Sequence, residues 1–232
     1  MSRGLIYLKS KFTNIITIDG TSSSGKTTIS KLLAKKLNFN VLDSGKLYRS
    51  VGFIASESSK SLDNIDNLDE LVSGISLESN NDTYDFEIFY KSKKIDHLLY
   101  DEHVGKAASI VSKIPQVRKL MLDIQHSCAK EANLIANGRD MGTEVFPDAI
   151  LKLYINASLE VRAKRRFDEL IDKGQKNVKL DDVFESLKKR DESDMNRAIS
   201  PLKIPDNAHI IDTSSLKPDA IVDKILNLYT IT

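Results

Sequence analysis

The sequence predicts an α/β fold, with a parallel five-stranded sheet covered by helices on both faces. Short apolar strands alternate with helical patterns along most of the chain, which is typical of a parallel sheet buried on both sides. One stretch, from 75 to 95, shows a period of two instead, which indicates a small antiparallel β-containing insert. Two polar helical patterns between 158 and 196 then predict a pair of polar helices.

Each element follows from its own pattern, in chain order. Apolar runs predict the five strands at 15–19, 41–42, 134–136, 150–155 and 209–211. Apolar residues at helical spacing predict helices at 29–37, 47–54, 104–111, 115–128, 158–172, 180–196 and 218–229. In the insert, alternate positions are apolar or aromatic, and Asn80-Asn81 suits a turn.

These elements divide the chain into three expected regions. The core comprises 13–59, 103–157 and 199–232, and the lid region comprises 158–198. The inserted subdomain is expected at 60–102, entered through the serine-rich stretch that starts at Ser56. The insert therefore interrupts the core once and the lid interrupts it a second time.

The composition excludes several classes of protein. The 34 Lys and Arg residues nearly balance the 33 Asp and Glu residues, so overall charge favours neither nucleic acid nor a membrane surface. The single cysteine, Cys128, excludes an internal disulfide framework and a cysteine zinc site. No apolar run is long enough to span a bilayer, and the N-terminal apolar stretch is too short for a signal peptide. We expect a cytoplasmic protein that acts as a monomer.

The segment between the first strand and the first helix fits the phosphate-loop pattern G-x-x-x-x-G-K-[ST]. In such a loop, backbone N–H groups converge on phosphate oxygens, and the following helix adds its N-terminal dipole. Lys26 would neutralise the outer phosphates, and the Thr27 hydroxyl would hold Mg²⁺. The predicted ATP-binding residues of this loop are Gly20, Thr21, Ser22, Ser23, Ser24, Gly25, Lys26, Thr27 and Thr28.

Other phosphate-loop proteins fit less well. A guanine-nucleotide switch needs N-K-x-D, and the similar residues from Asn177 to Asp181 have the wrong spacing. A motor or transporter subunit has a longer apolar strand that ends in Asp, whereas the strand from Leu134 leads into Asn137-Gly138-Arg139-Asp140. The remaining chemistry must therefore come from other polar clusters.

Three arginines suggest a cradle for a second phosphate. Arg49, Arg139 and Arg197 each lie at a strand end or in a polar break of the helical pattern. Arginine presents a planar fork that matches phosphate oxygens bidentately, although a surface ion pair is the ordinary role of any single one. Ligands of open α/β sheets bind outside the carboxyl ends of the strands, where Ser44 and Asp140 also belong.

At this point the chain resembles bacterial cytidylate kinases, which are nucleoside-monophosphate kinases of the phosphate-loop class. The resemblance runs from about Ile15 to Tyr229 and is carried by motifs in the family's order: Asp43-Ser44-Gly45 with Leu47-Tyr48-Arg49, Ala108-Ser109 with Arg118 after Pro115, Gly138-Arg139-Asp140-Met141-Gly142-Thr143, Phe146-Pro147-Asp148, and Asn196-Arg197-Ala198 with Pro201. It implies Mg²⁺-dependent transfer of a phosphoryl group from ATP to CMP or dCMP, giving CDP or dCDP. It also implies a CMP-binding insert and a mobile lid.

The resemblance implies roles for individual residues. CMP would be bound by Ser44, Arg49, Ser109, Arg118, Arg139, Asp140, Asp194 and Arg197, with Asp140, Ser109 and Arg118 on the cytosine and Asp194 on the ribose. The catalytic residues would be Lys26, Arg139, Arg190 and Arg197, and Arg162 and Arg166 would contact ATP.

Simpler readings stay open for several of these residues. Ser109 and Arg118 could lie on an exposed helical face, and Asp194 could pair with Arg197 within a helix. Charged side chains of the lid, including Arg165, could form a solvated face. Ser193 and Met195 stand where relatives commonly place arginines, and Ser23 where they often have glycine.

Other functions also fit the phosphate loop. The chain could phosphorylate UMP, dTMP or a small alcohol, or it could be a non-catalytic nucleotide-binding regulator whose insert docks a partner. A panel of acceptors separates the kinases from one another, and turnover itself separates them from the regulator.

Overall fold

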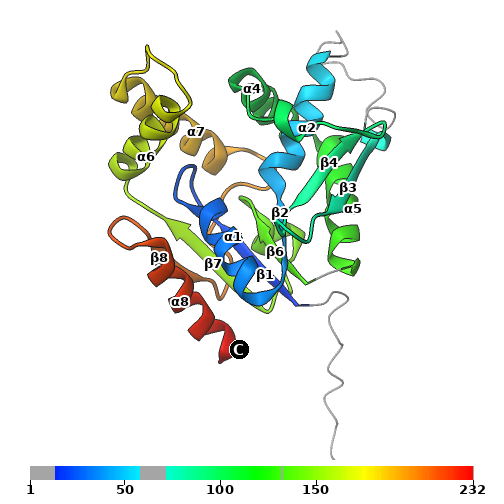
Figure 1. Ribbon diagram of the computed structural model, residues 1–232, viewed down its shortest axis with the longest axis vertical. Helices are drawn as coiled ribbons and strands as arrows, with labels where there is room; N and C mark the ends of the chain where they lie inside the picture. The colour runs from blue at the N-terminus through cyan, green and yellow to red at the C-terminus, as the bar shows by residue number, and fades with distance from the viewer. Residues whose placement is uncertain (1–13, 58–71, 132, 232) are drawn as a thin grey trace, which may run out of the picture.

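A parallel sheet forms the centre of the molecule in a computed structural model, which describes residues 14–57, 72–131 and 133–231. The strand order is β2-β6-β1-β7-β8, and all four pairings are parallel (Figure 1). The strands are β1 (Ile15–Asp19), β2 (Asn40–Asp43), β6 (Leu134–Asn137), β7 (Leu151–Asn156) and β8 (His209–Asp212). The predicted five-stranded parallel sheet is confirmed.

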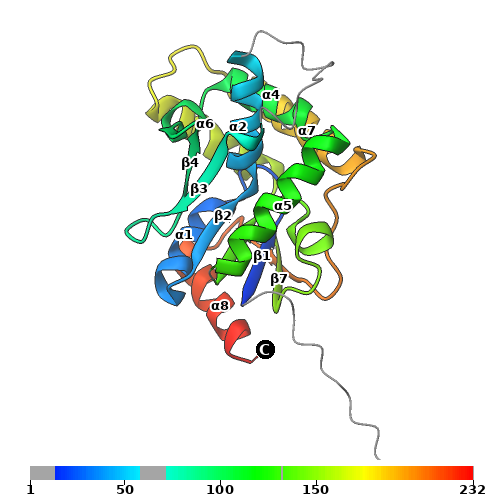
Figure 2. The same ribbon diagram turned by 90° about the vertical axis from the view of Figure 1, so that its right-hand side faces the viewer.

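Helices cover both faces of this sheet, as predicted. The α-helices are α1 (Lys26–Leu37), α2 (Ser44–Glu57), α4 (Glu102–Val111), α5 (Pro115–Glu131), α6 (Leu159–Asp172), α7 (Leu180–Asn196) and α8 (Pro218–Thr230). Helix α5 crosses one face of the sheet, whereas α1 and α8 lie on the other (Figure 2). Two short helical turns, η1 (Asp96–Leu98) and η2 (Met141–Val145), complete the fold; η2 is a π-helical turn.

Alternation along β1 decides which face each side chain covers. Ile16 and Ile18 enter the hydrophobic cluster that contains residues of α1 and α8. Ile15 points the other way and joins Cys128 and Ala129 of α5. Because successive side chains of a strand alternate, Asp19 lies on the same face as Ile15. Cys128 is thus a buried core residue, as expected.

The insert forms an antiparallel sheet of three strands, β3 (Ile75–Ser79), β4 (Phe86–Tyr90) and β5 (Lys93–Lys94). Its apolar side chains share one cluster with α2, α4 and α5. The backbone N–H of Val41 donates to the carbonyl of Tyr84 at 2.6 Å, which attaches the insert to the edge strand β2. Lys46 of α2 donates to the Phe86 carbonyl at 2.7 Å and pairs with Asp96. Of the predicted entry segment, the part from 58 onward lies outside the described residues.

The two helices of the expected lid, α6 and α7, pack against each other, and we keep the name lid for them. Ala163, Val183 and Leu187 form a small buried cluster whose partly buried neighbours also belong to 159–184. The lid and the group formed by α2, α4 and the insert stand on opposite sides of the phosphate loop (Figure 1). Among the described residues, no helix is both long enough and apolar enough to cross a membrane.

Candidate active site

The phosphate loop connects β1 to α1 and adopts a backbone that restricts its side chains. At Gly20, a Cβ atom would overlap the carbonyl oxygen of Ile155, so only glycine fits. Gly25 has φ 92°, which also favours glycine. Ser23 has φ 59°, in the left-handed region that glycine adopts without strain. The serine at this position is therefore an unfavourable local choice.

Lys26 is buried inside the loop. Its Nζ donates to the carbonyl of Gly20 at 3.0 Å and to that of Thr21 at 2.6 Å. Burial lowers the pKa of the Lys26 ammonium well below its usual value, and the nearby Arg139 guanidinium lowers it further. The Asp43 and Asp19 carboxylates oppose this lowering but do not overcome it, so a phosphate would supply the further negative charge that stabilises the ammonium.

Oxygen and amide groups surround the first turn of α1. The exposed Thr27 accepts a hydrogen bond at 3.3 Å from the Asn137 amide, which also donates to Asp43 at 3.4 Å. In the described part of the chain, no group of three or more His, Cys, Asp or Glu side chains could hold a metal ion. The donor set fits Mg²⁺, which proteins commonly bind with few side chains plus water and substrate phosphates.

Arg139 joins the phosphate loop to the lid. It lies two residues beyond the end of β6, and its Nη2 donates to Ser22 Oγ at 2.7 Å. Its Nε donates to Asp194 of α7 at 2.8 Å, so Asp194 pairs with Arg139 and not with Arg197 of its own segment. One guanidinium thus contacts both the loop predicted to hold ATP and the lid.

A second charged contact links the lid to the same loop. Arg162, at the start of α6, pairs with Asp191 of α7 at 2.6 Å and donates to the Ser22 carbonyl at 3.2 Å. Asp191 in turn accepts from the Ser22 N–H at 3.5 Å. Both charged side chains are at least nine-tenths buried. Arg162 is therefore engaged by protein groups, and its predicted contact with ATP needs this pair to rearrange.

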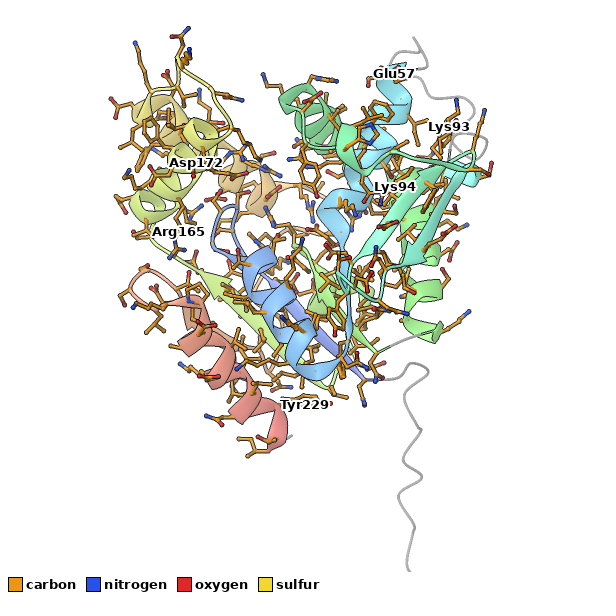
Figure 3. All side chains as sticks on the ribbon, viewed as in Figure 1. Glu57, Lys93, Lys94, Arg165, Asp172 and Tyr229 are labelled. Atoms are coloured by element: carbon orange, nitrogen blue, oxygen red, sulfur yellow. The ribbon has the colours of Figure 1, made fainter. Side chains whose placement is uncertain are left out.

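The other lid arginines differ in their surroundings. Arg165 donates to the hydroxyl and carbonyl of Thr213 after β8, at 3.1 Å and 2.6 Å (Arg165 and Asp172, both on α6, are labelled in Figure 3). Arg166 pairs with Glu169 one turn along α6 at 2.8 Å. Arg190 is exposed, and it faces the charges of Arg139 and Asp194.

Asp140 is the centre of a buried charged cluster. The Arg118 guanidinium of α5 contacts one carboxylate oxygen of Asp140, and Arg197 Nη2 lies 3.7 Å from the other. Arg118 also lies over the Tyr48 ring, 5.6 Å from its centroid. Arg197 Nη2 is buried and makes no hydrogen bond to the described residues, so a donor remains for a ligand.

The remaining predicted CMP residues lie on α2 and α4. Ser44 is the buried first residue of α2, and Arg49 on the same helix donates to the Leu99 carbonyl at 3.0 Å. Ser109 of α4 is half-buried and lies close to Arg118, because Ser112 contacts both through hydrogen bonds. Beside Arg197 there is a cavity of about 320 Å³, lined by Lys113, Ser193, Asn196, Arg197, Ala198 and Ile199.

Sequence reasoning missed two acidic residues of the site. Asp191 gives no signal beyond its place in a charged helix. Asp19 ends β1 immediately before the phosphate loop, and a carboxylate at that strand end was a recognisable signal. Its oxygens accept the N–H groups of Met141 and Gly142, both at 2.8 Å.

Comparison with known proteins agrees with this geometry. The cytidylate kinase family model matches residues 16–231. Cytidylate kinase of Azotobacter vinelandii is 38% identical over 215 residues, which cover 92% of this chain and 93% of that protein. Cytidylate kinase of Pasteurella multocida is 38% identical, with 92% and 93% covered. A solved structure of an uncharacterized protein from Eubacterium ventriosum has the same fold, with TM-score 0.53 and 12% identity over 94% of this chain and 99% of that one. The chain belongs to the cytidylate kinase family.

Proposed function

We propose that the chain transfers the γ-phosphoryl group of ATP to CMP or dCMP, giving ADP and CDP or dCDP. The observation that carries this proposal is the 2.7 Å hydrogen bond from Arg139 to Ser22. It places the arginine expected to bind the acceptor phosphate directly against the loop expected to bind the donor phosphates. In-line phosphoryl transfer requires this closeness of donor and acceptor.

On the donor side, Lys26 and the loop N–H groups bind the β- and γ-phosphates. The Lys26 ammonium leaves the Gly20 and Thr21 carbonyls and neutralises charge on the transferred group. Thr27 would hold Mg²⁺, which would neutralise charge on the ATP phosphates and so lower their repulsion of the nucleophile.

On the acceptor side, Arg49, Arg139 and Arg197 hold the CMP phosphate, and Ser44 lies at the start of the same helix as Arg49. Asp140 accepts from the cytosine amino group, while Arg118 and Ser109 face the other edge of the base. No general base is needed, because the phosphate oxygen of CMP is already ionised and is itself the nucleophile.

Closure of the lid supplies the last charges and excludes water. We infer that Arg190, Arg162 and Arg166 turn toward the ATP phosphates as the lid closes, and that Asp194 then contacts the ribose. Water would otherwise compete with CMP as the acceptor. The regions 13–59 with 103–157 and 199–232, 60–102 and 158–198 would act as core, CMP-binding insert and lid of a cytoplasmic monomer.

The decisive experiment measures ADP release from ATP with CMP, dCMP, UMP, dTMP and no acceptor in turn. We expect turnover with CMP and dCMP to exceed turnover with UMP and dTMP by a large factor. Preference for UMP or dTMP would reassign the substrate. ATP binding without turnover on any acceptor would favour the nucleotide-binding regulator instead.

A further inference from the structure

Asp19 touches two parts of the site at once. It is the last residue of β1, so its backbone leads directly into Gly20 of the phosphate loop. Its side chain is fully buried, and each carboxylate oxygen accepts one backbone N–H, from Met141 and from Gly142. These N–H groups begin the π-helical turn η2, which directly follows Arg139 and Asp140.

The turn η2 fits closely against β1. At Gly142, a Cβ atom would come within 2.8 Å of Thr17 Oγ1 and 2.9 Å of Pro205 Cγ, so the backbone of the turn has no room to shift toward the strand. The backbone N–H of Gly138 also donates to the Ile18 carbonyl at 3.0 Å. The segment from 138 to 142 is thus fixed to the end of β1 on both sides of Arg139 and Asp140.

We propose that Asp19 is a positioning residue that sets Arg139 and Asp140 relative to the phosphate loop, by binding the first N–H groups of η2 with both carboxylate oxygens. This inference rests on the proposed function, because it gives the ionised carboxylate a role in CMP binding. Asp19 touches neither substrate and acts through the turn. A carboxylate accepts both N–H bonds strongly, whereas a protonated carboxyl accepts one of them only weakly through its hydroxyl oxygen, and an amide presents a donor to one of them.

The charge state of Asp19 therefore matters. Burial raises the pKa of this carboxyl from 3.8 to about 6, against the lowering effect of the N–H groups. The ionisable groups facing it are Asp140, which raises the pKa, Lys26, which lowers it, and Tyr154 on β7. Protonation below that pKa should loosen the turn.

The raised pKa of Asp19 also determines how the stability of the fold changes with pH. The folded chain binds the Asp19 proton more tightly than the unfolded chain does, so this proton stabilises the fold below about pH 4, and the effect is lost as the pH rises through about 6. At neutral pH the buried charge opposes folding. Asp19→Asn removes this buried charge but leaves one N–H of η2 without an acceptor, so the two effects on the Tm oppose each other. We expect the Tm to change little while CMP binding weakens, which a merely structural residue would not do.

The test uses selective ¹⁵N-methionine labelling, because the chain has only four methionines. In the wild type, the Met141 amide should shift with pH around a midpoint near 6, and the shift should be absent in Asp19→Asn. Met121, buried in α5, serves as the internal control. A Met141 amide that does not titrate between about pH 5 and pH 7.5, or that titrates equally in Asp19→Asn, would overturn the proposal.

A kinetic experiment then tests the positioning. At a pH of about 7.5, above the range in which the CMP phosphate itself titrates, Asp19→Asn should raise the KM for CMP roughly tenfold, the effect of one lost charge-assisted hydrogen bond. The KM for ATP should change less than about twofold, because β1 pairing holds the loop backbone. An equal change in both KM values, or none, would contradict the proposal. If the wild type failed to phosphorylate CMP, the proposed function would fail, while the amide titration would still decide the role of Asp19.

Discussion

We define the acceptor arm as α2, the insert strands, α4 and α5. The lid and the acceptor arm lie on different sides of the phosphate loop (Figure 1). They are joined to the rest of the chain by different interactions. The acceptor arm has one hydrophobic cluster that runs through α2, the insert, α4 and α5. A second cluster joins it to the sheet, where Phe86 of the insert and Cys128 of α5 pack with Leu42 and other strand residues. The lid has a small cluster within α6 and α7 and reaches the phosphate loop and the turn after β6 through charged groups, Arg162–Asp191 and Arg139–Asp194.

This difference distinguishes the acceptor site, whose surroundings are held by apolar packing, from the donor site, whose charged contacts a ligand can replace. Apolar packing has no substitute in a ligand, so we expect the acceptor arm to hold its shape with or without CMP. Charged contacts can be exchanged for phosphate oxygens of similar geometry. We therefore expect donor binding to rearrange Lys26 and the lid, and acceptor binding to fill a site that already exists.

The largest expected effect comes from the donor side. Lys26→Ala should lower kcat by roughly 10²–10³, because it removes a charge aimed at the transferred group, while the Kd for CMP stays near that of the wild type. Lys31→Ala, an exposed position on the same helix, is the matched control and should retain normal turnover. Near-normal kcat in Lys26→Ala, or a parallel loss of CMP affinity, would contradict the assignment of Lys26 to the donor site alone.

A substitution on the acceptor side should change the preference for CMP over UMP. Asp140→Asn replaces a carboxylate that would repel the uracil carbonyl with an amide that can donate to it. We expect the ratio of kcat/KM for CMP over UMP to fall by roughly 10² or more, mainly through loss on CMP. Asp148→Asn, exposed and eight positions along the chain, is the control.

The same ratio tells two roles of Asp140 apart. A group that only balanced the charges of Arg118 and Arg197 would lower activity on both substrates alike. Reduced activity at an unchanged ratio would remove Asp140 from base recognition and leave it as a buried counter-ion.

Hydrogen exchange tests the comparison directly. With CMP and an ATP analogue bound, amides in 159–196 should gain protection by about tenfold or more, whereas those in 86–99 should change much less. The charged, core-poor connection between α6 and α7 should show the largest gain. Equal gains in both arms would show that the shared hydrophobic cluster does not hold the acceptor arm in place.

The smallest effect is local to the phosphate loop. Ser23→Gly should stabilise the fold by less than about 1 kcal/mol, because relief of the left-handed backbone is offset by the greater freedom of glycine in the unfolded chain. Asn38→Gly, at another left-handed residue outside the site, is the control for this balance. A loss of stability in Ser23→Gly would show that the serine has a compensating contact.

Most of the fold could be predicted because its signals are local. Strand and helix patterns located the described strands and helices to within a few residues, as at β1 and α5. The turn η2 was missed, because a π-helical turn after Asp140 depends on Asp19, which is far away in the sequence.

The site could be predicted as a set of residue types but not as a set of pairs. The phosphate-loop pattern identified Lys26, and the arginines identified a second phosphate position. Their partners are long-range: Arg139 with Asp194, Arg162 with Asp191, and Arg118 with Asp140. No spacing rule relates such residues, since only the packing of the lid and of α5 brings them together.

The self-contained cluster of the lid also affects how this chain can change. A substitution on the outer surface of α6 or α7 leaves the packing of the sheet untouched, so selection can act on lid charge without a folding penalty in the core. Ser193 and Met195, where the resemblance led us to expect arginines, lie in this segment. We therefore expect changes of charge on the outer surface of the lid to be tolerated more readily than changes in the sheet.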